Sequence, residues 1–357
     1  MDLWILDTDF QAIAIIDDYE SVLWVDRYNK PGEIEIYLSP NSISFKELQI
    51  GRYLYKNNTD HLMIIEGIEI KSDVESGAKA IITGRSLESI LDRRIIWNQT
   101  ILDGNFQNAV KKLLDDAIIN PTNANRKIKN FIFKESTDEK ITGLTVEAQF
   151  TGEDLLEAIT SMCESANVGF KITLNESNQF IFELYVGTDR TYEQTATSYV
   201  IFSNEFENLL NSDYITSNVE YKTVTLVAGE ESGETRKTIE VGDITITGLE
   251  RRELYTDARD IQSRDGDTTI PDEQYYAQLT ERGNEKLAEC KKTNAFEGEA
   301  DTNIMFKYGI DFFMGDIIQL KNEFGIEGKV RVTEFIISEN DSGHEEYPTF
   351  IMIDEEV

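Results

Sequence analysis

The sequence predicts an α+β fold, with short strands towards both ends of the chain and helices between them. Residues before 83 form short β-branched and apolar runs separated by turn signals. After Gly84 the apolar residues recur at helical spacing. Beyond Thr293 the short β-branched runs return. A mixed α/β segment is therefore expected between two regions of antiparallel strands.

Composition sets the size of the protein and excludes some partners. The chain has 357 residues, enough for two to four domains at roughly 100–200 residues each. It carries 34 lysines and arginines against 67 aspartates and glutamates, for a formal net charge of −33. Such a surface repels phosphates, so we expect no specific nucleic-acid binding. A hydrophobic content of 40% argues for a folded body and against a disordered acidic tail.

The N-terminal region is predicted to form seven short strands. Residues 33–38 alternate polar and apolar side chains, as a strand does with one buried and one exposed face. Pro31-Gly32 and residues 56–60 supply turn signals. Strands at this spacing favour a small closed barrel or sandwich. The predicted strands cover residues 3–6, 12–16, 21–27, 33–38, 53–56, 61–70 and 78–83.

A junction at residues 83–96 follows these strands. Gly84 is predicted to end the last strand, and Ser86 to cap a short helix with Ser89 at the reciprocal position. Leu87, Ile90 and Leu91 would face inward. Two interpretations stay open: a solvated helix end with scattered ion pairs, or a domain junction whose arginines hold acidic neighbours. The charged residues concerned are Arg85, Asp92, Arg93 and Arg94.

Two amphipathic helices and a hairpin follow the junction. Asn105 is expected to cap the first helix and Asn120-Pro121 to end it. Thr151 is expected to cap the second, with Asp154 at the reciprocal position. Residues 170–174 and 179–186 then read as a β-hairpin. The predicted buried stripes are Phe106, Val110, Leu113, Leu114 and Ile118 in the first helix, and Leu155, Leu156, Ile159, Met162, Cys163 and Ala166 in the second.

The C-terminal part is predicted to hold one long helix between strands. The helix would run from Ile270-Pro271 to Lys292, and Gly283 within it indicates close packing against another element. The expected strands cover residues 199–202, 216–227, 295–299, 303–308, 317–321, 329–338 and 347–353.

A short internal repeat links the two β regions. Residues 51–57 and 315–322 share a turn glycine, a strand and a Lys-Asn turn, and a returning strand follows each. Chance similarity between two hairpins is the alternative explanation. A true repeat would mean two related barrels.

Motifs for catalysis or metal binding are weak. His61 and His344 lack the partners of a metal site and are expected to be solvated loop residues. Residues 257–267 carry several aspartates but not the spacing of a calcium loop, so a hydrated loop is expected. A glycosidase carboxylate pair and a sugar-binding module stay open as alternatives, although core packing is the expected role of the tryptophans. The tryptophans are Trp4, Trp24 and Trp97.

The cysteines and the N-terminus are uninformative about function. Cys163 and Cys290 are expected to be buried free thiols. The N-terminus carries acids where a signal peptide has basic residues, and no apolar run approaches the length of a membrane span. We therefore expect neither a targeting segment nor membrane insertion.

The order of these elements resembles the tail hub, or baseplate hub, proteins of long-tailed bacteriophages, in particular the siphophage and prophage branch. The resemblance covers nearly the whole chain and is carried by residues 84–87, 91–95, 169–170, 185–191, 200–209 and 308–316. It implies two barrel domains, one of them interrupted by an α/β insertion, and a homotrimeric ring with pseudo-sixfold barrels. The implied parts are residues 1–95 (first barrel), 96–198 (α/β domain), 199–235 (second barrel), 236–294 (loop and long helix of the α/β domain) and 295–357 (second barrel).

The resemblance also implies a structural role without a cofactor, a metal or catalytic residues. The expected partners are a hexameric distal tail or tube protein, tail-tip fibre or lysin proteins, and the tape-measure protein. Lytic activity is not expected, because the chain ends at Val357 just after its last strand. We further expect residues 216–227 to complete the second barrel, and acidic residues to line a channel for DNA. The acids named for that channel are Glu33, Glu35, Glu66, Glu69, Asp316 and Glu334.

Overall fold

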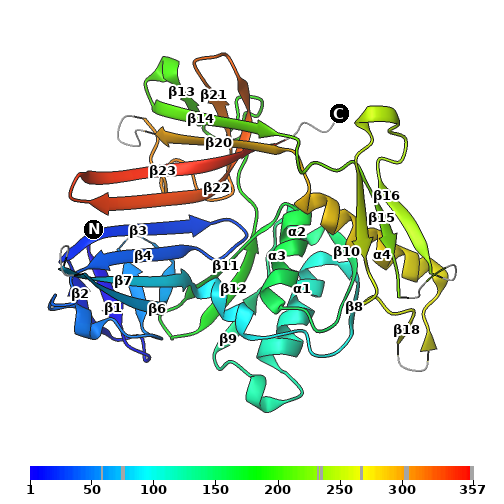
Figure 1. Cartoon of the computed structure of the whole chain (residues 1–357), viewed down its shortest axis with the longest axis horizontal. Helices are drawn as coiled ribbons and strands as arrows, with labels where there is room; N and C mark the ends of the chain where they lie inside the picture. Colours follow the sequence, from blue (N-terminus) through cyan, green and yellow to red (C-terminus); the bar gives the residue numbers. More distant parts are fainter. Residues whose placement is uncertain are drawn as a thin grey trace.

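One large curved sheet organises the protein (Figure 1). The computed structural model describes residues 1–57, 59–73, 77–230, 233, 236–265, 268–300 and 305–353. Thirteen strands belong to the large sheet, and eleven of them follow the order β14-β20-β23-β22-β3-β4-β7-β6-β5-β1-β2. An α/β region and a smaller three-stranded sheet with a long helix lie to one side of it (Figure 1).

The N-terminal half of the large sheet confirms the seven predicted strands. In β4 the apolar residues Ile34, Ile36 and Leu38 are buried and the residues between them are not, so one face of this strand covers the core. The strands are β1 (Leu3–Leu6), β2 (Ala12–Ile16), β3 (Tyr19–Arg27), β4 (Glu33–Leu38), β5 (Tyr53–Lys56), β6 (Leu62–Asp73) and β7 (Gly77–Ser86).

The junction after these strands differs from its prediction in two details. Gly84 does not end β7. A glycine is required at this position, because a Cβ there would lie 2.1 Å from the carbonyl oxygen of Ile64. Ser86 does not cap the 3₁₀ helix η2 (Leu87–Arg93), since its hydroxyl accepts a 2.7 Å hydrogen bond from the Gly32 N–H. The helix nevertheless buries its apolar side as expected.

The arginine at this junction favours one of the two interpretations. Arg85 contacts Glu66 on β6 and Asp92 on η2, each at 2.7 Å. It thus joins a strand of the large sheet to the helix that leads into the α/β region. Arg85 therefore holds two acids, as the second interpretation expects, whereas Arg94 donates to the main-chain carbonyls of Arg126 and Arg93.

The α/β region has its own core. Asn105 caps α1 by accepting a hydrogen bond from the Asn108 N–H, as predicted, and the helical segment ends before Asn120. A hairpin of β11 and β12 is extended by β9, which the sequence analysis missed and which runs parallel to β12. The elements are β8 (Thr100–Asn105), α1 (Phe106–Leu114), η3 (Asp115–Ile119), η4 (Ala124–Arg126), β9 (Phe131–Lys134), α2 (Glu139–Thr142), β10 (Thr145–Phe150), α3 (Leu155–Ser165), β11 (Gly169–Leu174) and β12 (Phe180–Tyr185).

The cap of α3 corrects the sequence analysis. Asp154, and not Thr151, is the N-cap residue, and its carboxylate accepts from the N–H groups of Leu156 and Glu157 at 2.8 and 3.2 Å. The Thr151 hydroxyl is buried without a hydrogen-bond partner. The helix begins at Leu155, the first residue of the predicted apolar stripe, but its cap lies three residues later than expected, because a carboxylate caps the first-turn N–H groups at least as well as a hydroxyl.

Asp154→Ala is therefore expected to cost about 1 kcal/mol of stability through loss of the cap. Thr151→Val, which removes a hydroxyl without a partner at nearly constant volume, is expected to be neutral or slightly stabilising. Chemical denaturation of the two variants checks this. A larger loss for the Thr151 variant would restore the original assignment.

The C-terminal half of the sheet also corrects one prediction. Residues 216–227 do not form one strand: β14 ends at Ser217, and β15 belongs to a separate sheet with β16 and β17. The predicted strand at 303–308 falls partly outside the described residues, and its remainder forms only an isolated bridge at Tyr308. The strands of this half are β13 (Ile201–Ser203), β14 (Leu209–Ser217), β20 (Thr293–Ala300), β21 (Ile317–Lys321), β22 (Glu327–Asn340) and β23 (Gly343–Met352).

Residues 218–292 form an insertion between β14 and β20. Its helix α4 (Asp272–Glu289) packs on its own three-stranded sheet and on β10 and α3 of the α/β region. Gly283 explains the close approach that the sequence predicted, since a Cβ there would lie 2.8 Å from the Val241 side chain. The remaining elements are η5 (Asn204–Phe206) before the insertion and, within it, β15 (Val224–Ala228), β16 (Thr238–Gly242), η7 (Gly248–Glu250), β17 (Glu253–Asp257), β18 (Arg264–Asp265) and β19 (Thr268–Thr269).

The two halves of the large sheet are not two separate closed barrels. Among the described residues neither half closes on itself, because β3 of the first half pairs with β22 of the second. A single apolar core runs through both halves and contains, for example, Trp24, Ile36, Phe202 and Phe335. The prediction of an α+β protein holds, whereas the barrels are open parts of one sheet.

Candidate assembly surface

Two equivalent units make up most of the large sheet. We define the first unit as β3–β7 and the second unit as β14 together with β20–β23. The order across the sheet is β3-β4-β7-β6-β5 in the first and β14-β20-β23-β22-β21 in the second, with the same chain order and the same antiparallel pairing. The strands correspond one to one.

Irregularities in the pairing recur at matching places. The register between the first two strands shifts between Tyr19 and Ser21 in one unit and between Leu209 and Asn211 in the other. A second shift falls between Ile65 and Gly67 on β6, and between Val332 and Glu334 on β22. Shared bulges are specific features of a fold. The shared bulges therefore define which residue of the first unit corresponds to which residue of the second.

The predicted sequence repeat coincides with this correspondence. Gly51 and Gly315 both have a left-handed backbone, with φ of 86° and 85°, which favours glycine. Each donates a 2.8 Å hydrogen bond, Gly51 to the Ile65 carbonyl and Gly315 to that of Val332. The repeat is therefore a structural equivalence between two units. The units differ in that β1 lies antiparallel to β5 whereas β13 lies parallel to β21.

The units meet head to tail inside the chain. Residues Ser21 to Arg27 of β3 pair with residues Asn340 to Glu334 of β22. Trp24 stands opposite Ile337 on the core side, and both are buried. On the other side of the sheet, Arg27 contacts Glu334 at 2.7 Å. Backbone pairing, an apolar contact and an ion pair thus hold the two units together.

Among the described residues, one strand edge of each unit remains open. There β6 pairs beyond residue 64 only with β7, so residues 67–73 of β6 have no described strand on their other side. Of the described strands, only β20 pairs with β14. In Figure 1 the strands are stacked from β14 at the top to β7 and β6 at the bottom, with the junction between units in the middle. Open edges expose backbone N–H and C=O groups that another strand can bind.

Comparison with known proteins identifies the family. The sequence matches the family of siphovirus ReqiPepy6 Gp37-like proteins over residues 2–350. The chain belongs to this family. Among the curated proteins, no sequence matches it. The resemblance to phage tail proteins stated from the sequence is thereby confirmed.

Solved prophage tail proteins share the fold of this Gp37-like chain. The 43 kDa tail protein of prophage MuSo2 from Shewanella oneidensis has a TM-score of 0.58 at 11% identity, with 99% of this chain and 98% of that chain covered. Prophage tail protein gp18 from Listeria monocytogenes EGD-e has a TM-score of 0.55 at 12% identity, covering 98% and 94%. The chain therefore belongs to a siphovirus protein family and has the fold of solved prophage tail proteins.

The acids expected to line a channel are partly neutralised. Glu33, Glu35, Glu69 and Glu334 share the face of the sheet opposite the core. Glu33 and Glu334 both contact Arg27, and Glu69 contacts Lys71. Glu66 contacts Arg85, whereas Asp316 is buried and contacts Arg190 at 2.6 Å. The face carries mixed charge and is not uniformly acidic.

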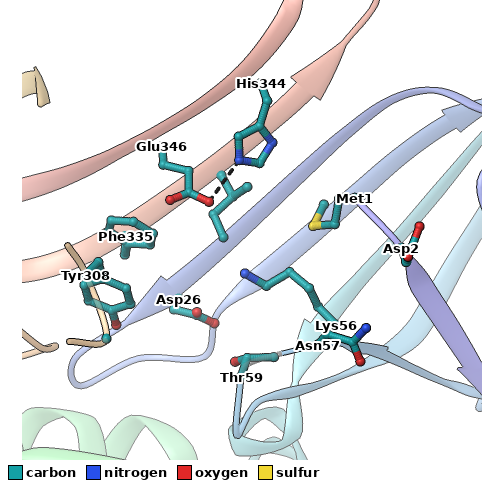
Figure 2. A pocket seen from close by; sticks show the side chains of 12 residues that line it. Met1, Asp2, Asp26, Lys56, Asn57, Thr59, Tyr308, Phe335, His344 and Glu346 are labelled. Carbon is teal, nitrogen blue, oxygen red and sulfur yellow. Dashed lines mark hydrogen bonds and ion pairs between the residues drawn. The ribbon is translucent and has the colours of Figure 1, made fainter. Parts of the chain in front are cut away.

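A cavity of about 410 Å³ lies where the two units meet (Figure 2). Lys56 extends into it from β5, and its burial lowers the pKa of the ammonium group. Asp26 lies beside it and accepts a hydrogen bond from the Trp24 indole. His344 contacts Glu346 and Glu339 at 2.9 Å, so it lies on a strand with two carboxylates and not in the solvated loop that was expected. No cysteine or serine of the described ranges lines this cavity.

The other candidate residues are placed as follows. In the calcium candidate, Asp257 contacts Arg236 and Arg259, and Asp260 contacts Arg282, while residues 266–267 lie outside the described part. Trp24 is buried as expected, but Trp97 is 54% exposed and lies under the Arg126 guanidinium. Both cysteines are free; Cys163 is buried and Cys290 half-buried. His61 is half-buried and directly precedes β6.

Metal and membrane sites were searched in the same residues. The part of the chain that the structure describes contains no group of three His, Cys, Asp or Glu side chains placed to hold a metal ion. Within that part, no helix is both long and apolar enough to cross a bilayer.

A buried charge cluster attaches the insertion to the α/β region. Arg282 on α4 contacts Asp260, Glu153 and Glu285 at 2.9, 3.1 and 3.3 Å. Burial raises the pKa of Glu285 from its ordinary value of 4.5 to about 7, although Arg282 opposes the shift. One carboxylate oxygen each of Glu153 and Glu285 has no hydrogen-bond partner. The sequence analysis missed this cluster, because Glu153 and Asp260 lie far from Arg282 in the chain.

The cluster predicts a pH dependence of stability. A carboxyl whose pKa is higher in the folded state contributes stability below its unfolded pKa and loses it as pH rises towards the folded value. We expect the protein to lose stability between pH 5 and about pH 7, and Glu285→Gln to reduce that loss. Thermal unfolding across this range checks it, with Glu289→Gln on the exposed face of α4 as control. Identical pH profiles for wild type and Glu285→Gln would contradict the assignment.

Proposed function

We propose that this chain is a structural hub of the phage tail tip, which forms a homotrimeric ring. The observation that carries the proposal is the pair of equivalent units joined head to tail within one chain. A head-to-tail contact leaves one complementary edge free at each end, and repetition of such a contact generates a closed ring when the rotation fits. Three chains with two units each give six equivalent units.

This arrangement fits a protein that connects a sixfold-symmetric assembly to a threefold-symmetric one. Six similar units match a sixfold tail tube, while the insertions at residues 96–198 and 218–292 occur once per chain and keep only threefold symmetry. The proposed partners are accordingly a hexameric distal tail or tube protein on one side and fibre or lysin proteins on the other. The ring would stand at the tail tip of the virion, assembled in the cytoplasm of the host bacterium.

The face of the sheet opposite the core is proposed to line the central channel. DNA and the tape-measure protein would pass along it. Its ion pairs leave few unpaired cations to hold phosphates, since Arg27 and Arg85 each contact two carboxylates. DNA would then pass without binding because the positive and negative charges of the channel wall are balanced, and not because the wall is strongly acidic.

The role is proposed to be non-enzymatic. The alternatives from the sequence, a peptidoglycan or polysaccharide hydrolase and a carbohydrate-binding module, gain no specific support from the described side chains. In the cavity at the unit junction Glu346 contacts His344 and Asp26 accepts a hydrogen bond from Trp24, and the exposed Trp97 is covered on one side by Arg126.

Light scattering of the purified chain tests the proposal. The expected mass is three times the 40.8 kDa of one chain, without release of sugar or peptide from peptidoglycan. A monomer at all accessible concentrations would overturn the ring, and turnover of peptidoglycan or polysaccharide would overturn the structural role.

A further inference from the structure

We infer that copies of this chain join by pairing strand β14 of one copy with residues 67–73 of β6 in the next, in the register that β3 and β22 show within the chain. The inference rests on the proposed ring and names the surface that closes it. It follows from the correspondence between the two units, which makes the inner junction a template for the outer one.

The correspondence between the two units assigns a counterpart to each strand of the inner junction. β3 corresponds to β14, and β22 corresponds to β6. The inner junction joins β3 to the stretch of β22 that follows its bulge. The strands left without such a partner are the counterparts of these two, β14 and the stretch of β6 that follows its own bulge. A contact of the inner type between copies would pair these two edges with each other.

Burial at the two places supports a missing neighbour on β6. Ile337 on β22 is 2% exposed and stands opposite Trp24 of β3 at the inner junction. Its counterpart on β6, counted from the bulge, is Ile70, which is 56% exposed. An isoleucine that protrudes from an open strand edge favours association. The same comparison pairs Val25, 4% exposed, with Ile215 on β14, 45% exposed.

The register follows by counting from the bulges. Within the chain Val25 stands opposite Ile336, and Asp26 opposite Phe335. Translating each residue to its counterpart places Ile215 opposite Glu69. The next pair places Thr216 opposite Ile68, on the other side of the sheet. Tyr214 then falls opposite Ile70, as Trp24 falls opposite Ile337.

Cysteine pairs test this register directly. In a Cys290→Ser background, the double variants Ile215→Cys with Glu69→Cys and Thr216→Cys with Ile68→Cys are oxidised and run on non-reducing gels. The two positions of each pair lie on β14 and β6, at opposite ends of the two joined units, so a crosslink joins two copies of the chain (Figure 1). We expect covalent dimers and trimers from at least one of the pairs, since directly opposed strand residues have Cα atoms within disulfide reach.

A register-shifted pair is the matched control. Ile215→Cys with Lys71→Cys lies on the same face but two residues, about 7 Å, further along the strand, beyond disulfide geometry. We expect its crosslinked fraction to be at least about tenfold lower. Equal or stronger crosslinking of this control would overturn the register. A trimer by light scattering in which neither designed pair crosslinks would overturn the edge pairing but leave the ring intact, whereas a monomer would count against the ring itself.

Ile70→Asp tests the same surface without crosslinks. A charge buried at the outer junction is expected to weaken self-association about tenfold or more while the thermal midpoint of the monomer stays unchanged. Ile244→Asp is its control, because Ile244 lies in the insertion and is 58% exposed. Unchanged association of Ile70→Asp, or equal weakening by both variants, would contradict the inference.

Discussion

Tyr28→Ala is expected to lower the free energy of unfolding by about 3–5 kcal/mol, the usual cost of removing a large buried aromatic ring. Tyr28 follows β3, is 2% exposed and lies where both units and the α/β region meet. Its ring fills the space beside Gly169 and Gly315, where an added Cβ would lie 2.3 Å from it in either case. Its backbone N–H donates to the Thr333 carbonyl on β22. Denaturation with urea measures the loss.

Tyr28→Phe separates the ring from its hydroxyl. The hydroxyl donates to the Asn167 carbonyl at 3.0 Å, so this variant is expected to cost only about 1 kcal/mol. A cost of less than about 1 kcal/mol for Tyr28→Ala would show that this contact does not hold the three parts together. Equal costs for the two variants would assign the effect to the hydrogen bond alone.

Arg282→Met is expected to destabilise the attachment of the insertion by about 3–5 kcal/mol, because it removes the cation from a buried cluster and leaves its acids unpaired. Arg282 is 8% exposed and bridges α4 to Glu153 of the α/β region and to Asp260. The loss should be larger at pH 8 than at pH 6, since Glu285 is then ionised. Hydrogen exchange of α4 reports the opening of this interface.

Lys286→Met is the matched control on the same helix. Lys286 contacts Glu289 at 2.7 Å near the surface, and pairs of this kind contribute about 0–1 kcal/mol. Similar exchange rates for the two variants would show that burial of the Arg282 cluster adds nothing.

The sequence predicted the strands well because local signals determine them. Alternation in residues 33–38 and the turn at Pro31-Gly32 place β4 between the bounds that the structure has. The cap of α1 was predictable for the same reason, since Asn105 and the apolar stripe lie within one turn of each other. At α3 both Thr151 and Asp154 have side chains that can cap a helix, and only the structure shows that Asp154 is the N-cap residue.

Contacts between distant residues were not predictable. No local sequence pattern in β3 or β22 indicates that these two strands pair. Two closed barrels were therefore expected in place of one continuous sheet. The same holds for Arg282, whose partners come from three different segments. Residues 216–227 were taken as one strand because they are rich in β-branched side chains, yet residues 218–223 break it.

The internal repeat was the most useful long-range signal. A glycine and a short hairpin in residues 51–57 and 315–322 suggested two related halves, with chance similarity as the alternative. The shared bulges, which no sequence pattern reveals, turn that similarity into a residue-by-residue correspondence. The exposed edge of β6 became visible only through this correspondence.

End-on electron microscopy of the purified chain tests the proposed ring most directly. We expect a closed ring with a central opening, six similar lobes around it and a threefold repeat of larger features contributed by the insertions. Isolated single chains, open filaments or rings with another symmetry would contradict the proposal that two joined units per chain build the hub.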